Sequence, residues 1–177
     1  MSMNTTDSRD LPVEDIDLVA TWLVADKVRW LAGIAAGLFA GVVALGFAGV
    51  LAVAGGMEFW FPVKLMGTWI VGASGTEIGL NYGNIFAGLL IVEALAAFWG
   101  FVYAHFVKTS SLGALLAMGL VWGVFGWIFH WNLYFHSIRT ILASNVSPAA
   151  AFPVFLVYGL TLTSVAFFDR AFRGRKI

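Results

Sequence analysis

The segment from Leu31 to Val53, LAGIAAGLFAGVVALGFAGVLAV, contains no charged residue and is rich in glycine and alanine. An uninterrupted apolar run of this length is what a helix needs to cross the hydrocarbon core of a bilayer. Gly33, Gly37 and Gly41 lie on one side of that helix, where small residues let two helix backbones approach closely. The segment therefore predicts a transmembrane helix that packs tightly, by default within the chain and alternatively against a partner subunit.

The composition of the whole chain agrees with a membrane protein. Of its 177 residues, 60% are hydrophobic and 11% are charged, with a mean hydropathy of +0.89, whereas soluble domains have roughly 45–50% and about 25%. Cysteine is absent, which excludes disulfides and thiolate metal sites. The formal net charge is +0 and no basic run occurs, so we expect no nucleic-acid partner. The first apolar run is long and follows an acidic start, so we expect a retained anchor rather than a secretory signal.

Four apolar segments are long enough to span a bilayer, and they predict an all-α integral membrane domain over residues 29–169. The predicted spans cover about residues 30–53, 82–107, 112–136 and 148–168. Ser147 followed by Pro148 has the pattern of an N-cap with proline at the first helical position. The apolar segment from Pro62 to Gly72 would be only ~16 Å long as a helix, too short to cross. It predicts an external helix that is interfacial or shallowly re-entrant.

Lysine and arginine are distributed unevenly between the two sides of these predicted spans. With four spans the termini share a side, which carries eight of the ten basic residues: Arg9, Lys27, Arg29, Lys108, Arg170, Arg173, Arg175 and Lys176. The other side carries Lys64 and Arg139. Because basic residues concentrate in cytoplasmic loops, both termini are predicted to be cytoplasmic and the chain to lie in the inner membrane.

The two ends of the chain outside the membrane domain differ in charge. Residues 1–28 are predicted to form a cytoplasmic, acidic, amphipathic segment, and residues 170–177 a basic cytoplasmic tail. The apolar residues of the first segment fall at helical spacing, from Ile16 to Val24. Its polar side is acidic, so it is either a plain interfacial lead-in helix or a contact for a protein partner.

Glu93 is the costliest residue of the predicted spans, because it lies ~15 Å from the outer end of its helix. Trp127 and Tyr158 fall at matching depth in the neighbouring spans, and each carries one donor suited to a carboxyl oxygen. We interpret the three residues as an intramembrane polar cluster. It would be either a neutral hydrogen-bonded tie between helices or a carboxyl group that relays protons or binds a ligand.

Gly119 and Gly123 predict a second closely packed helix face, in the third span. The same helix ends in WIFHWNLYFH, Trp127 to His136, with two of the three histidines. His130 and His136 would lie ~9 Å apart along the helix and ~120° apart around it, so they do not converge on one ion. We predict polar residues at the membrane interface rather than a cofactor site, and we expect no metal and no cofactor.

Three stretches resemble a loosely defined group of bacterial inner-membrane proteins with four spans. They are FPVKLMGTWIVG (61–72), GLLIVEALAAFWGFVYA (88–104) and SLGALLAMGLVWGVFGWIFHWNLYF (111–135). In that group the position of Glu93 is often a histidine, so this chain departs from the pattern there. The resemblance implies a four-span inner-membrane fold and no particular activity.

These patterns favour a non-catalytic protein over an enzyme. We expect an accessory subunit of a larger inner-membrane complex, such as a respiratory or other redox assembly, whose partners are lipid and other membrane subunits or further copies of itself. The alternative is a small oligomeric transporter or channel for ions, protons or metabolites that uses Glu93. A third alternative is a subunit in which His130 or His136 holds a cofactor.

Overall fold

A computed structural model describes residues 25–72, 77–131 and 146–174, and within these ranges all regular structure is helical. Four of the described helices are long and apolar enough to span a membrane, which confirms the predicted fold class. They are α2 (Lys27–Ala54), α4 (Tyr82–Phe106), α5 (Leu112–Ile128), which ends in a π-helical turn over 129–131, and a final helix. That final helix consists of α8 (Pro148–Thr161), η3 (Leu162–Ser164) and α9 (Val165–Gly174). The chain is a multi-pass membrane protein.

A fifth, shorter helix, α3 (Phe61–Val71), lies where the external helix was predicted. The fourth spanning helix continues to Gly174, so part of the predicted basic tail is helical. The predicted amphipathic helix of residues 16–24 and the end of the third span, with His136, lie outside the described residues.

Polar residues begin three of the spanning helices by accepting a backbone hydrogen bond from the first turn. The side chain of Asp26 accepts from the amide of Arg29 at 3.0 Å, and that of Asn81 accepts from the amide of Asn84 at 3.0 Å. Ser147 caps α8 with Pro148 in its first turn, as the sequence predicted. Such caps satisfy amide groups that have no partner inside the helix.

The glycines of α2 pack against α4, within the chain. A Cβ atom added to Gly37 would lie 2.2 Å from the carbonyl oxygen of Ala96, and one added to Gly33 would lie 2.5 Å from that of Gly100. Only glycine lets the two backbones come this close. The helices touch through their main chains along this segment, which we call the α2–α4 seam.

A second seam joins α5 to α8. A Cβ atom on Gly119 would lie 2.5 Å from the carbonyl oxygen of Gly159, and one on Gly123 would lie 2.7 Å from that of Phe155. The three glycines at positions 119, 123 and 159 therefore let the backbones of α5 and α8 approach each other about as closely as those of α2 and α4. Both predicted small-residue faces are used inside this chain.

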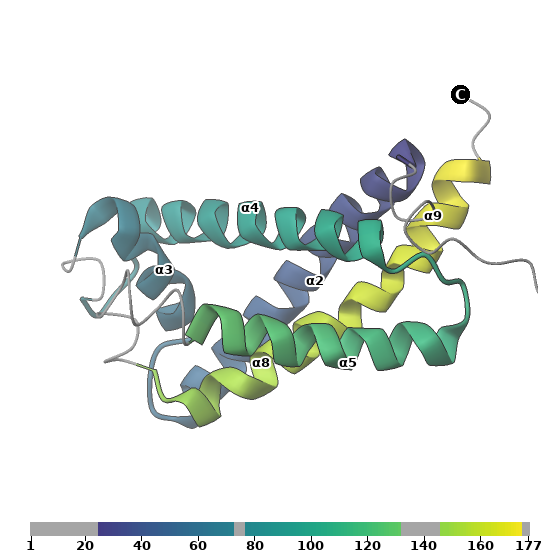
Figure 1. The fold of residues 1–177 in the computed structure, drawn as a ribbon. Helices are drawn as coiled ribbons and strands as arrows, with labels where there is room; N and C mark the ends of the chain where they lie inside the picture. The colour runs from purple at the N-terminus through teal and green to yellow at the C-terminus, as the bar shows by residue number, and fades with distance from the viewer. Residues whose placement is uncertain (1–24, 73–76, 132–145, 175–177) are drawn as a thin grey trace, which may run out of the picture.

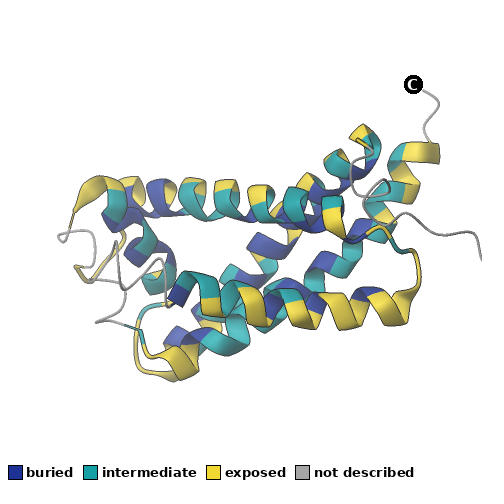
Figure 2. Cartoon of the chain, in the orientation of Figure 1, coloured by how far each residue is buried: buried dark blue, intermediate teal, exposed yellow. Residues whose placement is uncertain are grey.

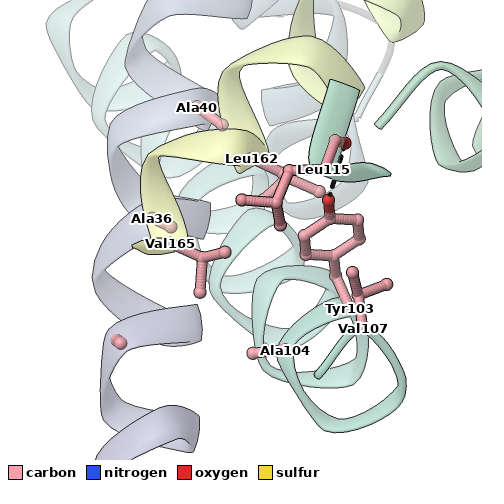
Figure 3. Close-up of a cluster of buried hydrophobic side chains, with 9 residues drawn as sticks. Ala36, Ala40, Tyr103, Ala104, Val107, Leu115, Leu162 and Val165 are labelled. Atoms are coloured by element: carbon pink, nitrogen blue, oxygen red, sulfur yellow. Dashed lines mark hydrogen bonds between the residues drawn. The ribbon is translucent and has the colours of Figure 1, made fainter. Parts of the chain in front are cut away.

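The two seams are joined by the buried cluster in Figure 3. Tyr103 of α4 is fully buried and its hydroxyl donates a hydrogen bond to the carbonyl oxygen of Leu115 in α5 at 3.2 Å. Leu162, the first residue of η3, and Val165, the first residue of α9, belong to the same cluster with Ala36 of α2. The cluster lies near the end of the bundle where α2 begins and α9 ends, which we call the terminal end.

The helices are not parallel, and this shapes the opposite end of the bundle. In Figure 1, α2 and the α8–α9 helix run obliquely to α4 and α5, and α3 lies beside the first part of α4. Buried residues face inward on every helix, whereas the outward sides of α4 and α5 are exposed, as Figure 2 shows. Those outward sides carry large apolar residues such as Phe86 and Val121, as expected for surfaces that face lipid.

Replacement of Gly37 by alanine tests the α2–α4 seam. The new Cβ would overlap a backbone atom that cannot move alone, so Gly37→Ala should lower the free energy of unfolding by about 1–3 kcal/mol. Gly46→Ala is the matched control, because a Cβ there meets nothing within 4 Å. Thermal denaturation of both variants in one detergent measures the difference. Equal stability of Gly37→Ala and the unchanged chain would contradict the seam.

Candidate functional site: an apolar cavity beside Glu93

The terminal end of the bundle is held by a buried arginine. Arg29 of α2 is 6% exposed; it donates to the carbonyl oxygen of Val107 at 2.7 Å and to that of Thr109 at 3.1 Å. Its guanidinium also forms an ion pair with Asp169 of α9 at 3.3 Å. A single side chain thus satisfies carbonyl groups at the end of α4 and joins three helices.

Two further ion pairs extend this contact to the surface. Arg173 bonds to Asp169 at 3.0 Å and also to Asp26, the N-cap of α2. Burial raises the pKa of Asp26, but the hydrogen bond from the Arg29 amide and the Arg173 guanidinium outweigh it and hold the pKa below its ordinary value. Asp26 is therefore ionised at neutral pH, and the network closes the terminal end between α2 and α9.

At the opposite end, which we call the α3 end, a buried lysine anchors α3. Lys64 is 1% exposed, and its ammonium group donates to Glu58 Oε2 at 2.8 Å and to the carbonyl oxygens of Gly79 at 2.9 Å and of Glu77. The side-chain amide Nδ2 of Asn84 in α4 donates to the Lys64 carbonyl oxygen at 3.0 Å. The loop before α4 is thus folded over the lysine, and α3 is fixed against α4.

Between these two ends lies a cavity of about 400 Å³. One wall is α2 from Gly41 to Ala52, and another is the α3 face that carries Phe61 and Leu65. The side of α4 around Trp99, the side of α5 around Trp122 and the first turns of α8 complete it. The lining is almost wholly apolar and aromatic. It begins where the α2–α4 seam ends, because beyond Gly41 the oblique helices are separated.

Aromatic rings bridge α4 and α5 on one side of the cavity. Trp99 of α4 packs edge-to-face against Trp122 and Phe129 of α5, with ring centroids 6.1 and 5.2 Å apart. The ring of His130 lies against Phe155 of α8, with centroids 5.3 Å apart. These rings fill the space that the helix backbones leave, and several of them present their surface to the cavity.

His130 uses both ring nitrogens within the chain. Its Nε2 accepts a hydrogen bond from the indole of Trp99 at 3.2 Å, so Nδ1 carries the proton and donates to the Gly126 carbonyl oxygen at 2.8 Å. A metal or haem iron would need one of these lone pairs. His105, near the terminal end of α4, accepts from the indole of Trp30 at 3.2 Å. In the described ranges, no group of three histidine or acidic side chains is placed to hold a metal ion.

Glu93 lies at the edge of the cavity and faces α2. Both carboxyl oxygens are 2.9 Å from the position that a Cβ of Gly41 would take, and Ala96 borders the same point. Gly41 and Ala96 both line the cavity, whereas Glu93 adjoins it. Its Oε1 is buried and has no hydrogen-bond partner in the described part of the chain. A bare carboxyl oxygen at this depth is costly, so the site favours a proton or a cation there.

The donors that the sequence suggested for Glu93 are used elsewhere. The hydroxyl of Tyr158 donates to the Ala96 carbonyl oxygen at 2.8 Å, one turn from Glu93 on α4. The indole of Trp127 donates to the Pro148 carbonyl oxygen at 3.2 Å and ties α5 to the start of α8. Each group has one hydrogen to give. The depth of Tyr158 was therefore close to the prediction, but its hydrogen bond reaches the main chain rather than the carboxyl group.

Several residues that build the site had no recognisable role in the sequence. Arg29 and Lys64 were counted only as charges that orient the chain, and Trp99 only as an apolar residue. The partners of Arg29 and Trp99, Asp169 and His130, lie far away in the sequence. The one sequence feature that hinted at the Arg29 ion pair was an acidic residue, Asp169, close to the end of an apolar segment.

Comparisons with protein-family models, with curated proteins and with solved structures found no match.

Acidification tests the anchor of α3. The hydrogen bond from Lys64 and that from the Gly79 amide hold the pKa of Glu58 below its ordinary value of 4.5. Its ionised form therefore stabilises the fold at neutral pH, and this contribution is lost as the pH falls through the lowered pKa. Between about pH 6 and about pH 3, the melting temperature should fall more for the unchanged chain than for Glu58→Gln. The exposed Glu77→Gln is the control and should keep the full dependence, whereas an equal fall in all three would contradict the anchor.

Proposed function

We propose that this chain is a non-catalytic accessory subunit of a larger membrane complex. The class of complex that we propose is a respiratory or other redox assembly. The observation that carries the proposal is that these polar side chains bind groups within the chain itself. Arg29 binds carbonyl groups at the end of α4, and Lys64 binds those of the loop before α4. Tyr158 and Trp127 bind main-chain carbonyl groups, and His130 is held by Trp99 and Gly126. These groups hold the helices together, which is the chemistry of a structural component.

We also propose that the protein lies in a bacterial inner membrane with both termini in the cytoplasm. Eight of its ten basic residues belong to the side that carries the termini.

Glu93 supports a second candidate, an oligomeric transporter of protons, small ions or metabolites. The structure describes two acidic side chains within the spans. Asp169 is paired with arginine, whereas Oε1 of Glu93 has no hydrogen-bond partner among the described residues. Intramembrane carboxyl groups in transporters exchange protons or cations in such places. In this role Glu93→Gln would abolish flux, whereas in an accessory subunit it would leave assembly and the activity of the complex unchanged.

Purification under native conditions tests the accessory role. An affinity-tagged chain at its normal expression level, taken from its own membranes in mild detergent, should elute with larger partners in fixed stoichiometry. A tag on the partner should retrieve the chain in return. Mass spectrometry identifies the partners, and a visible spectrum of the same sample detects any cofactor.

His130→Ala is the companion variant for this purification. Because the histidine is already bound on both nitrogens, any absorption of the complex should be the same in the variant. Loss of colour would instead support a cofactor on this chain. A colourless homo-oligomer without partners would overturn the accessory role and favour transport.

A further inference from the structure

The cavity beside Glu93 has a chemistry that neither proposed role requires. Its volume of about 400 Å³ is in the range of sites for drug-sized molecules. The walls are mostly apolar side chains of α2, α3, α4, α5 and α8, so the body of an occupant must be apolar. Since binding can be measured on the purified chain, an inference about the occupant stands apart from the question of partners.

Aromatic rings make the cavity suited to positive charge as well as to apolar groups. Trp99, Trp122, Phe155 and Tyr158 all line it. The faces of such rings attract cations, and the attraction is greatest where water is excluded. The donors of Trp99 and Tyr158 are already bound to His130 and to Ala96, so these side chains offer their rings and not a hydrogen bond.

Glu93 supplies the negative charge. Its carboxyl oxygens lie against Gly41 and Ala96, two residues of the cavity wall, and Oε1 has no hydrogen-bond partner in the described ranges. The residue as a whole is half-buried, whereas Oε1 itself is buried against this part of the cavity wall. Arg29 and Lys64, the buried cations described above, are bound at the two ends of the bundle, where each has its own carboxylate partner.

We propose that this cavity binds an amphiphilic organic cation. The apolar body of the ligand lies among the aromatic rings, and its positively charged centre pairs with the carboxylate of Glu93. A neutral lipid chain would fill the same walls but would leave the carboxyl group without a partner. The unpartnered oxygen is what favours a cation over a lipid chain.

Equilibrium binding of radiolabelled tetraphenylphosphonium to the full chain in lipid nanodiscs tests this inference. The unchanged protein should bind the cation saturably, and an uncharged triarylphosphine oxide should compete at least about tenfold more weakly. Glu93→Gln should weaken binding by about 10- to 100-fold, because it removes the negative charge that attracts the cation. Glu93→Asp retains the charge and should recover most of the affinity.

Two further variants separate the cavity from general effects of mutation. Ala48→Phe places a ring in the cavity from α2 and should also weaken binding at least about tenfold. Glu77→Gln makes the same change as Glu93→Gln at an exposed position outside the spans and should bind like the unchanged chain. Thermal denaturation confirms that each variant is folded.

Three results would overturn the inference. The first is the absence of saturable binding to the unchanged chain. The second is equal affinity in Glu93→Gln and the unchanged protein. The third is equal competition by the neutral compound, which would make the cavity a site for lipid chains. None of these results bears on whether the chain co-purifies with partners, so the accessory role stands or falls separately.

Discussion

The close contact between the backbones of α2 and α4 is the constraint on which the rest of the structure depends. Gly33 and Gly37 leave no room for a side chain between the helices, and Gly100 is equally crowded from the other side. Within a bilayer the hydrophobic effect does not bring helices together, so such contacts supply the attraction. They also fix where the two helices cross, and hence where they must separate.

The separation beyond Gly41 accounts for the α3 end of the molecule. Oblique helices that touch at the terminal end leave a space at the other, and α3 occupies part of it. Lys64 secures α3 through three oxygen acceptors, which lets a helix of 11 residues hold a fixed position. The remaining space is the cavity, with Glu93 at the point of separation. Arg29 closes the terminal end by the same means, since it satisfies carbonyl groups of one helix from another.

Much of this fold follows from local sequence. The four spans, the short helix from Phe61 to Val71 and the Ser147 cap each depend on apolar length or on neighbouring residues. The close packing at Gly33 and Gly119 was likewise signalled by small residues at helical spacing. In each case the physical cause lies within one turn or one helix, so the sequence displays it directly.

The site was predictable only in part, because it depends on how separate helices meet. Counting depth along the spans placed Tyr158 near Glu93, but depth does not say which way a side chain turns, and the hydroxyl bonds to Ala96. The bond between Trp99 and His130 and the ion pair of Arg29 with Asp169 join residues 31 and 140 positions apart. The cavity is a consequence of helix angles, which no local pattern records.

Helices that separate beyond Gly41 leave α2 sealed against its neighbours before that residue and bordering an open cavity after it. The most direct test uses the absence of native cysteine. Single cysteines at Ala36, fully buried in the cluster of Figure 3, and at Ala48, which lines the cavity, are treated with a small membrane-permeant maleimide. A single cysteine at Ile78, exposed in the loop before α4, provides the reference rate. If the helices separate beyond Gly41, position 48 is labelled and position 36 is protected. Equal protection at both, or rapid labelling at 36, would contradict it.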